Sequence, residues 1–170
     1  MQVRPALVLM LLCGCEQAAP AAAGAPAGPP RADVTFKDVT VRQYRGGQLR
    51  VVATAPRVEL MRGSNDFSAQ DAGVFLKRSG VTVLAQRVTG NGVTQLATGS
   101  DGVLFLGNDG TVGRTERATY DRALGPDGAG VSDAGVTIDH PRFHLEAAAF
   151  FADFAEQRVS FDSPVTRTKE

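Results

Sequence analysis

Apolar and polar residues alternate through most of the chain after residue 31, and this two-residue period is typical of β-strands with one buried face. The clearest run is Leu49 to Ala55, where every second residue is apolar. Gly46-Gly47 before it predicts a hairpin turn, and Asn91-Gly92 predicts a second, two-residue turn. Strand-like runs of this kind recur every 8 to 12 residues or so, bounded by turn residues. We therefore predict an all-β fold.

Two local features refine this prediction. Val34 and Phe36 have the opposite parity to Val39 and Val41, which predicts a β-bulge near Lys37-Asp38. The segment from Leu145 to Phe154 is rich in alanine, which favours a helix, but its Phe/Ala alternation and its neighbours favour a strand. We predict a strand there.

A weak internal similarity links residues 68–74 to residues 132–136, which share a Ser, Asp-Ala-Gly-Val pattern. Two interpretations remain open. Chance resemblance is common in a chain rich in Gly, Asp and Val, whereas a repeated hairpin unit stacked along one axis would produce the same echo. The turns Ser100-Asp101-Gly102 and Asn108-Asp109-Gly110 are predicted to separate strands.

Composition excludes several classes of function. The chain has 18 basic and 18 acidic residues and no basic block, so binding to nucleic acid through phosphate neutralisation is not expected. The absence of Trp, with only two Tyr, argues against a carbohydrate-stacking module. We expect no cofactor and no enzyme activity, because no phosphate loop or nucleophile elbow is present. His140 and His144 lie near Asp139 and Glu146, but a solvated strand face explains them better than a metal site.

The first 14 residues are predicted to be a signal peptide. Arg4 is followed by an apolar run, Ala6 to Leu12, that is too short to span a bilayer. The run ends in Leu12-Cys13-Gly14-Cys15, which resembles the lipobox of bacterial lipoproteins. The spacing selects Cys15 as the lipidated residue, since Cys13 would place bulky Leu12 at the cleavage site. Both cysteines of the chain lie in this segment, so no disulfide stabilises the rest.

Residues 15–31 form the predicted linker between the lipidated cysteine and the folded domain. The segment is dominated by Ala, Pro and Gly, a composition typical of tethers. Glu16 after the cysteine slightly favours retention at the inner membrane over the outer. The remainder, residues 32–170, is predicted to be one domain by length.

The second half of the domain carries a family pattern. Asp109 to Asp121 reads as a strand, a Thr-Glu step and a Tyr-Asp corner; Gly135 to Ala147 and Val159 to Val165 follow. Together with the early Ala-x-Ala-Pro step at residues 53–56, these elements resemble the LptC/OstA-like family, the periplasmic bridge components of lipopolysaccharide export. Two departures are the lipid anchor in place of a transmembrane helix and an inserted Ala152 between Phe151 and Asp153.

The resemblance implies a single antiparallel β-jelly roll of two sheets whose greasy interior binds the acyl chains of lipopolysaccharide. It implies as partners the permease subunits of an inner-membrane ABC transporter and a periplasmic jelly-roll bridge protein, with the domain on the periplasmic side of the envelope. Strand parity then nominates the residues that face the lipid: Leu49, Val51, Val74, Leu76, Val81, Val83, Phe105, Val136, Ile138, Phe143, Leu145 and Phe161.

Three functions remain open from the sequence. The first is lipid transfer, with acyl chains entering the fold. The second is a membrane-anchored β-sandwich that serves only to dock partner proteins, and the third is a receptor for a soluble ligand. A filled core and an acyl-binding slot give the same alternating pattern, so alternation does not separate the first two.

Overall fold

The computed structural model describes residues 33–125 and 127–169. The predicted signal peptide, the lipid attachment at Cys15 and the linker up to residue 31 all lie outside the described residues. Within the described part, no helix is long and apolar enough to cross a membrane.

The described residues form 13 strands and one short 3-10 helix, and the all-β prediction is confirmed. The elements are β1 (Val34–Arg45), β2 (Gln48–Met61), β3 (Asp66–Leu76), β4 (Val81–Asn91), β5 (Leu96–Leu106), β6 (Val112–Thr115), β7 (Ala118–Asp121), η1 (Arg122–Leu124), β8 (Ala129–Ser132), β9 (Val136–His140), β10 (Phe143–Ala147), β11 (Ala149–Asp153), β12 (Arg158–Asp162) and β13 (Val165–Thr168).

Hydrogen bonds join all these strands into one antiparallel sheet. Each long strand pairs with the next along the chain, from β1 to β5. The C-terminal half of β5 pairs with β6 and its N-terminal half pairs with β7, so β6 and β7 are two halves of one bent strand. In the same way, β8 and β9 are the two halves of one bent strand, as are β10 and β11, and β12 and β13, and each bent strand pairs with the next. The connectivity is a meander in one sheet, and the predicted division into two separate sheets is not seen.

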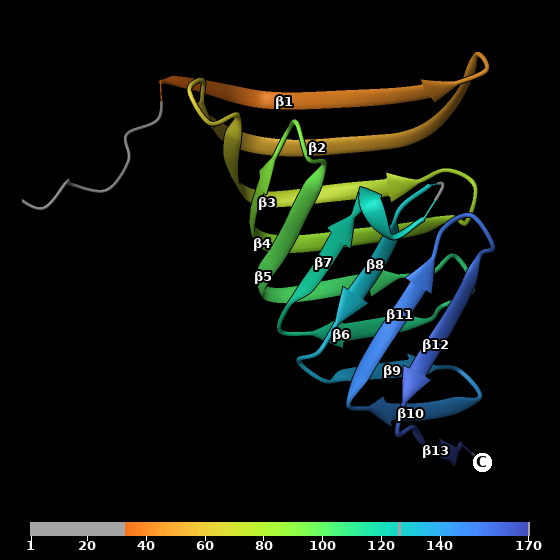
Figure 1. The fold of residues 1–170 in the computed structure, drawn as a ribbon. Helices are drawn as coiled ribbons and strands as arrows, with labels where there is room; N and C mark the ends of the chain where they lie inside the picture. The colour runs from red at the N-terminus through yellow and green to blue at the C-terminus, as the bar shows by residue number, and fades with distance from the viewer. Residues whose placement is uncertain (1–32, 126, 170) are drawn as a thin grey trace, which may run out of the picture. The chain divides into compact units, whose positions relative to one another are not determined.

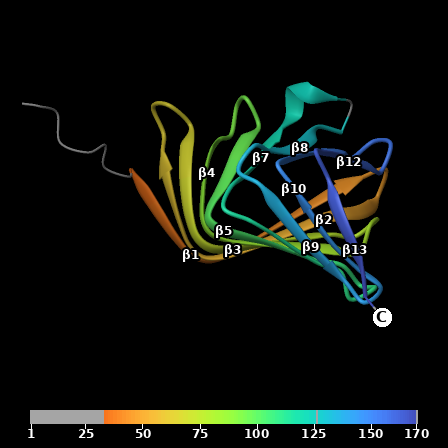
Figure 2. The ribbon, with the colours of Figure 1, turned by 90° about the horizontal axis from the view of Figure 1, so that it is seen from below.

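Every long strand bends near its middle, so the sheet is folded over on itself into two layers. Figure 1 shows β7, β8, β11 and β12 in front of β6, β9, β10 and β13, and Figure 2 shows the two layers from below. The ring of Phe105 in the rear layer meets the ring of Phe150 in the front layer edge-on, with centroids 5.5 Å apart. The two layers therefore face one another, and we call the surfaces that meet the inner faces.

Residues in the left-handed backbone region mark the bends of alternate strands. Asp38, Asp71, Asp101 and Ser163 have φ between 48° and 61°, and Gly135 has φ 73°. At the bend of β1 and β2 the pairing passes over one residue on each strand, since Lys37 pairs with Arg57 and Val39 with Ala55. The register does not shift there, so the β-bulge predicted near Lys37-Asp38 is not seen, and the change of parity comes from the bend at Asp38. The bend lets Phe36 and Val39 face the same side although they are three residues apart.

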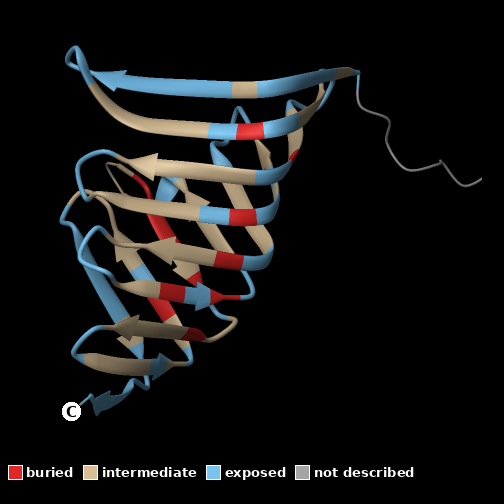
Figure 3. Ribbon diagram, turned by 180° about the vertical axis from the view of Figure 1, so that it is seen from behind, coloured by how far each residue is buried: buried red, intermediate tan, exposed pale blue. Residues whose placement is uncertain are grey.

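The same three-residue step recurs along the sheet. Inward residues flank the bends as the pairs Phe36/Val39, Ala55/Val58, Ala69/Ala72, Ala85/Val88, Thr115/Ala118 and Ala147/Phe150. Many of these residues are small, because two layers of backbone approach each other at the fold. Most of the fully buried residues lie beside this line of bends, as Figure 3 shows.

Two details of the sequence prediction are corrected. Ser100-Asp101-Gly102 does not separate two strands but forms the bend inside β5, because Asp101 and Gly102 both adopt positive φ within a continuous strand. The turn at Asn91-Gly92 exists but is four residues long. The Asn91 side chain accepts hydrogen bonds from the backbone N–H groups of Val93 and Thr94, which widens the turn.

The alanine-rich segment forms strands, as predicted, although a bend at Ala148 divides it into β10 and β11. The two segments of the internal similarity, 68–74 and 132–136, both lie at bends. The motif Ala55-Pro56-Arg57 is followed by Ala85-Gln86-Arg87 and Thr115-Glu116-Arg117, each 30 residues further on and each at a bend. These positions favour the repeated-hairpin interpretation.

Candidate functional site: two facing apolar rows

A continuous row of uncharged side chains crosses the inner face of the rear layer. Residues paired directly across antiparallel strands lie on the same face. Following the pairing from strand to strand gives Val41, Ala53, Val74, Val83, Phe105, Gly113, Ile138, Leu145 and Thr166, which we call row A.

A second row crosses the inner face of the front layer. It consists of Val34, Leu60, Phe67, Gly90, Ala97, Tyr120, Gly130, Ala152 and Val159, which we call row B. Row B lies on the same face of β11 as Phe150, whose ring meets Phe105 of row A. Neither row contains a charged residue, so the two layers present apolar surface to each other from β1 to the C-terminal strands.

Glycines in both rows make room for aromatic rings. A Cβ built on Gly90 would lie 2.6 Å from the ring of Phe67, and one built on Gly113 would lie 3.2 Å from the ring of Phe105. The rings therefore lie over the neighbouring glycine backbone instead of standing away from the sheet, an arrangement that covers otherwise bare backbone.

The register places the predicted lipid-facing residues as follows. Five of them, Val74, Val83, Phe105, Ile138 and Leu145, belong to row A. Val51, Leu76, Val81, Val136 and Phe143 lie two residues from row A on the same strands and hence on the same face. Phe161 pairs with Phe150 and faces inward from the front layer. Leu49 differs: it pairs with Tyr44 while Val51 pairs with Gln43, so a bulge at Arg50 interrupts the alternation between them.

No residue of row B was among the lipid-facing residues predicted from the sequence. The prediction assumed that inward and outward side chains alternate without interruption along each strand. At the bend this alternation shifts by one residue. The three-residue step seen at Phe36 and Val39 recurs in the sequence at Ala55/Val58 and Ala85/Val88, and this repetition would have located the second row.

The inner faces are apolar but poorly buried. Among the described residues, the buried apolar side chains are Ala55, Ala69, Ala85, Val103, Ala129, Val136 and Phe150, and no large side chain is completely buried. The inner-face residues of the long strands, such as Val74, Val83 and Leu145, are only half-buried. At the two ends of the rows, Val41 and Val159 are 57% and 51% exposed. A closed core of a domain this size would bury such residues fully.

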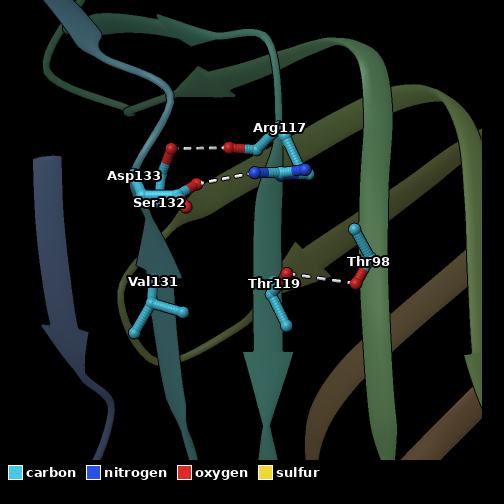
Figure 4. A pocket seen from close by; sticks show the side chains of 6 residues that line it. All are labelled: Thr98, Arg117, Thr119, Val131, Ser132 and Asp133. Carbon is cyan, nitrogen blue, oxygen red and sulfur yellow. Dashed lines mark hydrogen bonds and ion pairs between the residues drawn. The ribbon is translucent and has the colours of Figure 1, made fainter.

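A shallow hollow of about 430 Å³ lies on the outer surface beside the bend between β8 and β9 (Figure 4). The Thr98 and Thr119 hydroxyls lie 3.0 Å apart, and the Arg117 guanidinium lies 2.9 Å from the Asp133 carboxylate. The Ser132 hydroxyl donates to the Arg117 carbonyl at 2.6 Å. All the polar side chains that line the hollow are thus bonded to one another or to the backbone, and the hollow is a structural corner.

A charged cluster covers the outer face of the C-terminal strands. His144 Nδ1 lies 2.8 Å from Asp139 and its Nε2 lies 3.1 Å from Glu146. Arg114 and Lys169 also reach Asp139, at 3.0 and 3.6 Å. The hydrogen bond to Asp139 raises the pKa of His144, and the bond to Glu146 adds to the rise, while His144 lowers the pKa of Asp139.

His140 does not join this cluster. Its ring stacks on Phe143, with centroids 4.6 Å apart. Within residues 33–125 and 127–169, no group of three or more His, Cys, Asp or Glu side chains converges as metal ligands would. The cluster is therefore a network of surface ion pairs.

No family model matches this chain, and no curated protein matches it in sequence.

Proposed function

We propose that this chain is a lipid-transfer protein of the cell envelope, a lipoprotein-anchored relative of the LptC/OstA-like bridge components of lipopolysaccharide export. In this proposal Cys15 carries the lipid anchor, the domain lies on the periplasmic side, and the anchor holds it at the inner rather than the outer membrane. Its partners are the permease subunits of an ABC transporter and a periplasmic bridge protein.

The single observation that supports this proposal best is the half-exposed state of the two facing apolar rows. Apolar surface that remains accessible between two layers is a favourable environment for acyl chains, since each buried CH₂ contributes about 0.8 kcal/mol. Rows without charge that run across the full width of the sheet match a long apolar ligand. We call the space between row A and row B the slot, and we propose that its layers act as the two sheets of a jelly roll.

The free edges of the sheet support the bridging part of the proposal. Among the described strands, β1 pairs only with β2, and at the other end β13 pairs only with β10 and β12 only with β11. Unpaired strand edges are templates for adding a strand from another sheet. Joining sheets edge to edge would align row A and row B with the equivalent rows of a partner and extend the slot.

Photo-crosslinking tests the slot directly. We expect crosslinkers at Val83 and Phe105 to capture lipopolysaccharide while the transporter is active, because both face inward in row A. Crosslinkers at Thr82 and Leu84, which flank Val83 on the outer face of β4, should not capture it. Capture of protein alone at every inward position, in a folded domain, would replace lipid transfer by a docking-only function.

Matched substitutions in β4 provide a second measurement. Val83→Asp should abolish lipid capture, because an unpaired carboxylate among apolar side chains is costly to bury. Leu84→Asp introduces the same charge one residue away, where the side chain points outward and Leu84 is 38% exposed, and it should retain capture. Circular dichroism of both variants establishes that the strands remain. Equal lipid capture by the two variants would contradict the slot.

A further inference from the structure

The bends divide each strand so that its two ends lie at the two free margins of the folded sheet, which form the mouth of the slot. One margin contains the strand ends and turns at residues 42–50, 76–82, 106–112, 140–143 and 167–169. It carries eight Lys and Arg residues against one carboxylate, Asp109, and we call it the basic rim. The opposite margin, at residues 33–34, 60–67, 90–97, 120–125, 127–130 and 152–159, carries three basic and six acidic residues.

The pairing of these charges differs between the rim and the bends. At the bends, Arg87 pairs with Asp101 at 3.2 Å and Arg117 with Asp133 at 2.9 Å. On the basic rim, Lys169 reaches Asp139 and Arg45 reaches Asp127 across the mouth. The other rim cations, which are Arg42, Arg50, Lys77, Arg78, Arg142 and Arg167, form no ion pair with the described residues.

Arg50 adds an independent observation. It is half-buried at the bulge of β2, and its Nε is a buried donor without a hydrogen-bond partner among the described residues. An unsatisfied buried donor on a charged group is costly unless a ligand completes it. An anion at the rim would supply both the missing acceptor and the missing charge.

We infer that the basic rim binds the phosphate or carboxylate of an anionic amphiphile whose acyl chain lies in the slot. The inference rests on the proposed function, since it needs the acyl chain between row A and row B. The geometry is suitable because Lys77 and Arg78 lie in the turn just before β4, which starts at Val81. Val83 of row A lies two residues further along β4, roughly 7 Å inside the slot. Charge-assisted bonds from Lys and Arg to phosphate are among the stronger hydrogen bonds in proteins.

Two amphiphiles with the same twelve-carbon chain, dodecyl phosphate and dodecyl maltoside, test this with the purified full chain at about 0.05 M salt. We expect dodecyl phosphate to bind roughly ten-fold more tightly or better, and the preference to fade at high salt. The double charge reversal K77E/R78E should remove the preference and leave the affinity for dodecyl maltoside within about two-fold.

The matched control is R62E/R158E, which makes the same change in net charge on the opposite margin and should retain the preference. Equal binding of both amphiphiles by the wild type, or an unchanged preference in K77E/R78E, would overturn the rim site while leaving the slot intact. Binding of inorganic phosphate as tightly as dodecyl phosphate would also overturn it, because a free-anion site needs no slot. Failure of both amphiphiles to bind would contradict the proposed function itself.

Discussion

At the scale of single residues, the folded sheet depends on side chains that tolerate positive φ. Asp38, Asp71 and Asp101 occupy the left-handed region at the bends of alternate strands, where glycine is the usual residue. Aspartate is one of the few other residues found there with any frequency, because its short polar side chain bonds locally. The bends are therefore built into the sequence at particular positions and do not result from general flexibility.

Asp71 offers a direct test, since it is exposed and its side chain forms no hydrogen bond or ion pair with the described residues that a substitution would remove. Asp71→Val should lower the free energy of unfolding by about 1–2 kcal/mol, because a β-branched residue is strained at φ 48°. Asp71→Gly should be nearly neutral. Chemical denaturation measures both, and Gln70→Val, next to the bend but with ordinary backbone geometry, is the control. Equal losses from the Val and Gly variants would show that the side chain, not the backbone, matters.

The residue scale also shows where prediction from sequence succeeded. The parity slip between Phe36 and Val39 located the first bend, although not as the bulge that was predicted, because both flanking pairs are apolar and clearly out of phase. The bend at Asp101 was predicted as a turn between two strands, since Asp-Gly is a common hairpin signal and gives no indication that the strand continues. Bends and turns use the same residues, and only the pairing of neighbouring strands distinguishes them.

At the scale of elements, β9 and β10 are linked by the outer-face cluster around His144. Because hydrogen bonds to Asp139 and Glu146 raise the pKa of His144 above its ordinary 6.5, the folded state binds the proton more tightly than the unfolded chain. This stabilisation is fully present below pH 6.5 and is lost as the pH rises through the raised pKa. The lowered pKa of Asp139 acts in the acid range, where its stabilisation is lost on protonation below about its ordinary 3.8.

We therefore expect the thermal unfolding midpoint to fall between pH 6 and pH 9 in the wild type by more than in His144→Gln. His140→Gln is the matched control, because His140 stacks on Phe143 and lies outside the cluster, and it should follow the wild-type curve. Midpoints read by circular dichroism across this range provide the measurement. Parallel curves for wild type and His144→Gln would show that the cluster contributes nothing to stability.

At the scale of the whole molecule, the described residues form one sheet in which each strand pairs with its neighbours. The all-β class followed from alternation, but the single folded sheet did not, because alternation is the same in a straight strand and in either half of a bent one. Strand order was equally hidden, since pairing between β7 and β8 or between β10 and β13 depends on contacts that local pattern does not encode.

A protein that begins at Ala32 should fold without the preceding segments. The first described strand starts at Val34, and Asp33, whose N–H donates to the Leu60 carbonyl at 3.0 Å, is retained in this protein. A far-ultraviolet spectrum dominated by β-structure and a cooperative thermal transition are expected. A disordered or helical spectrum would mean that residues 1–31 take part in the fold.

If the slot carries lipid as proposed, the 30-residue spacing of Ala55, Ala85 and Thr115 has a consequence for the size of that ligand. One such unit adds two bent strands to the sheet, and neighbouring strands lie about 4.8 Å apart, so each unit widens the molecule by roughly 10 Å. The width of the slot would therefore change only by whole repeats, according to how many hairpins the gene encodes. Duplicating or deleting one repeat would change the size of the accommodated molecule in fixed increments, without altering a single side chain that touches it.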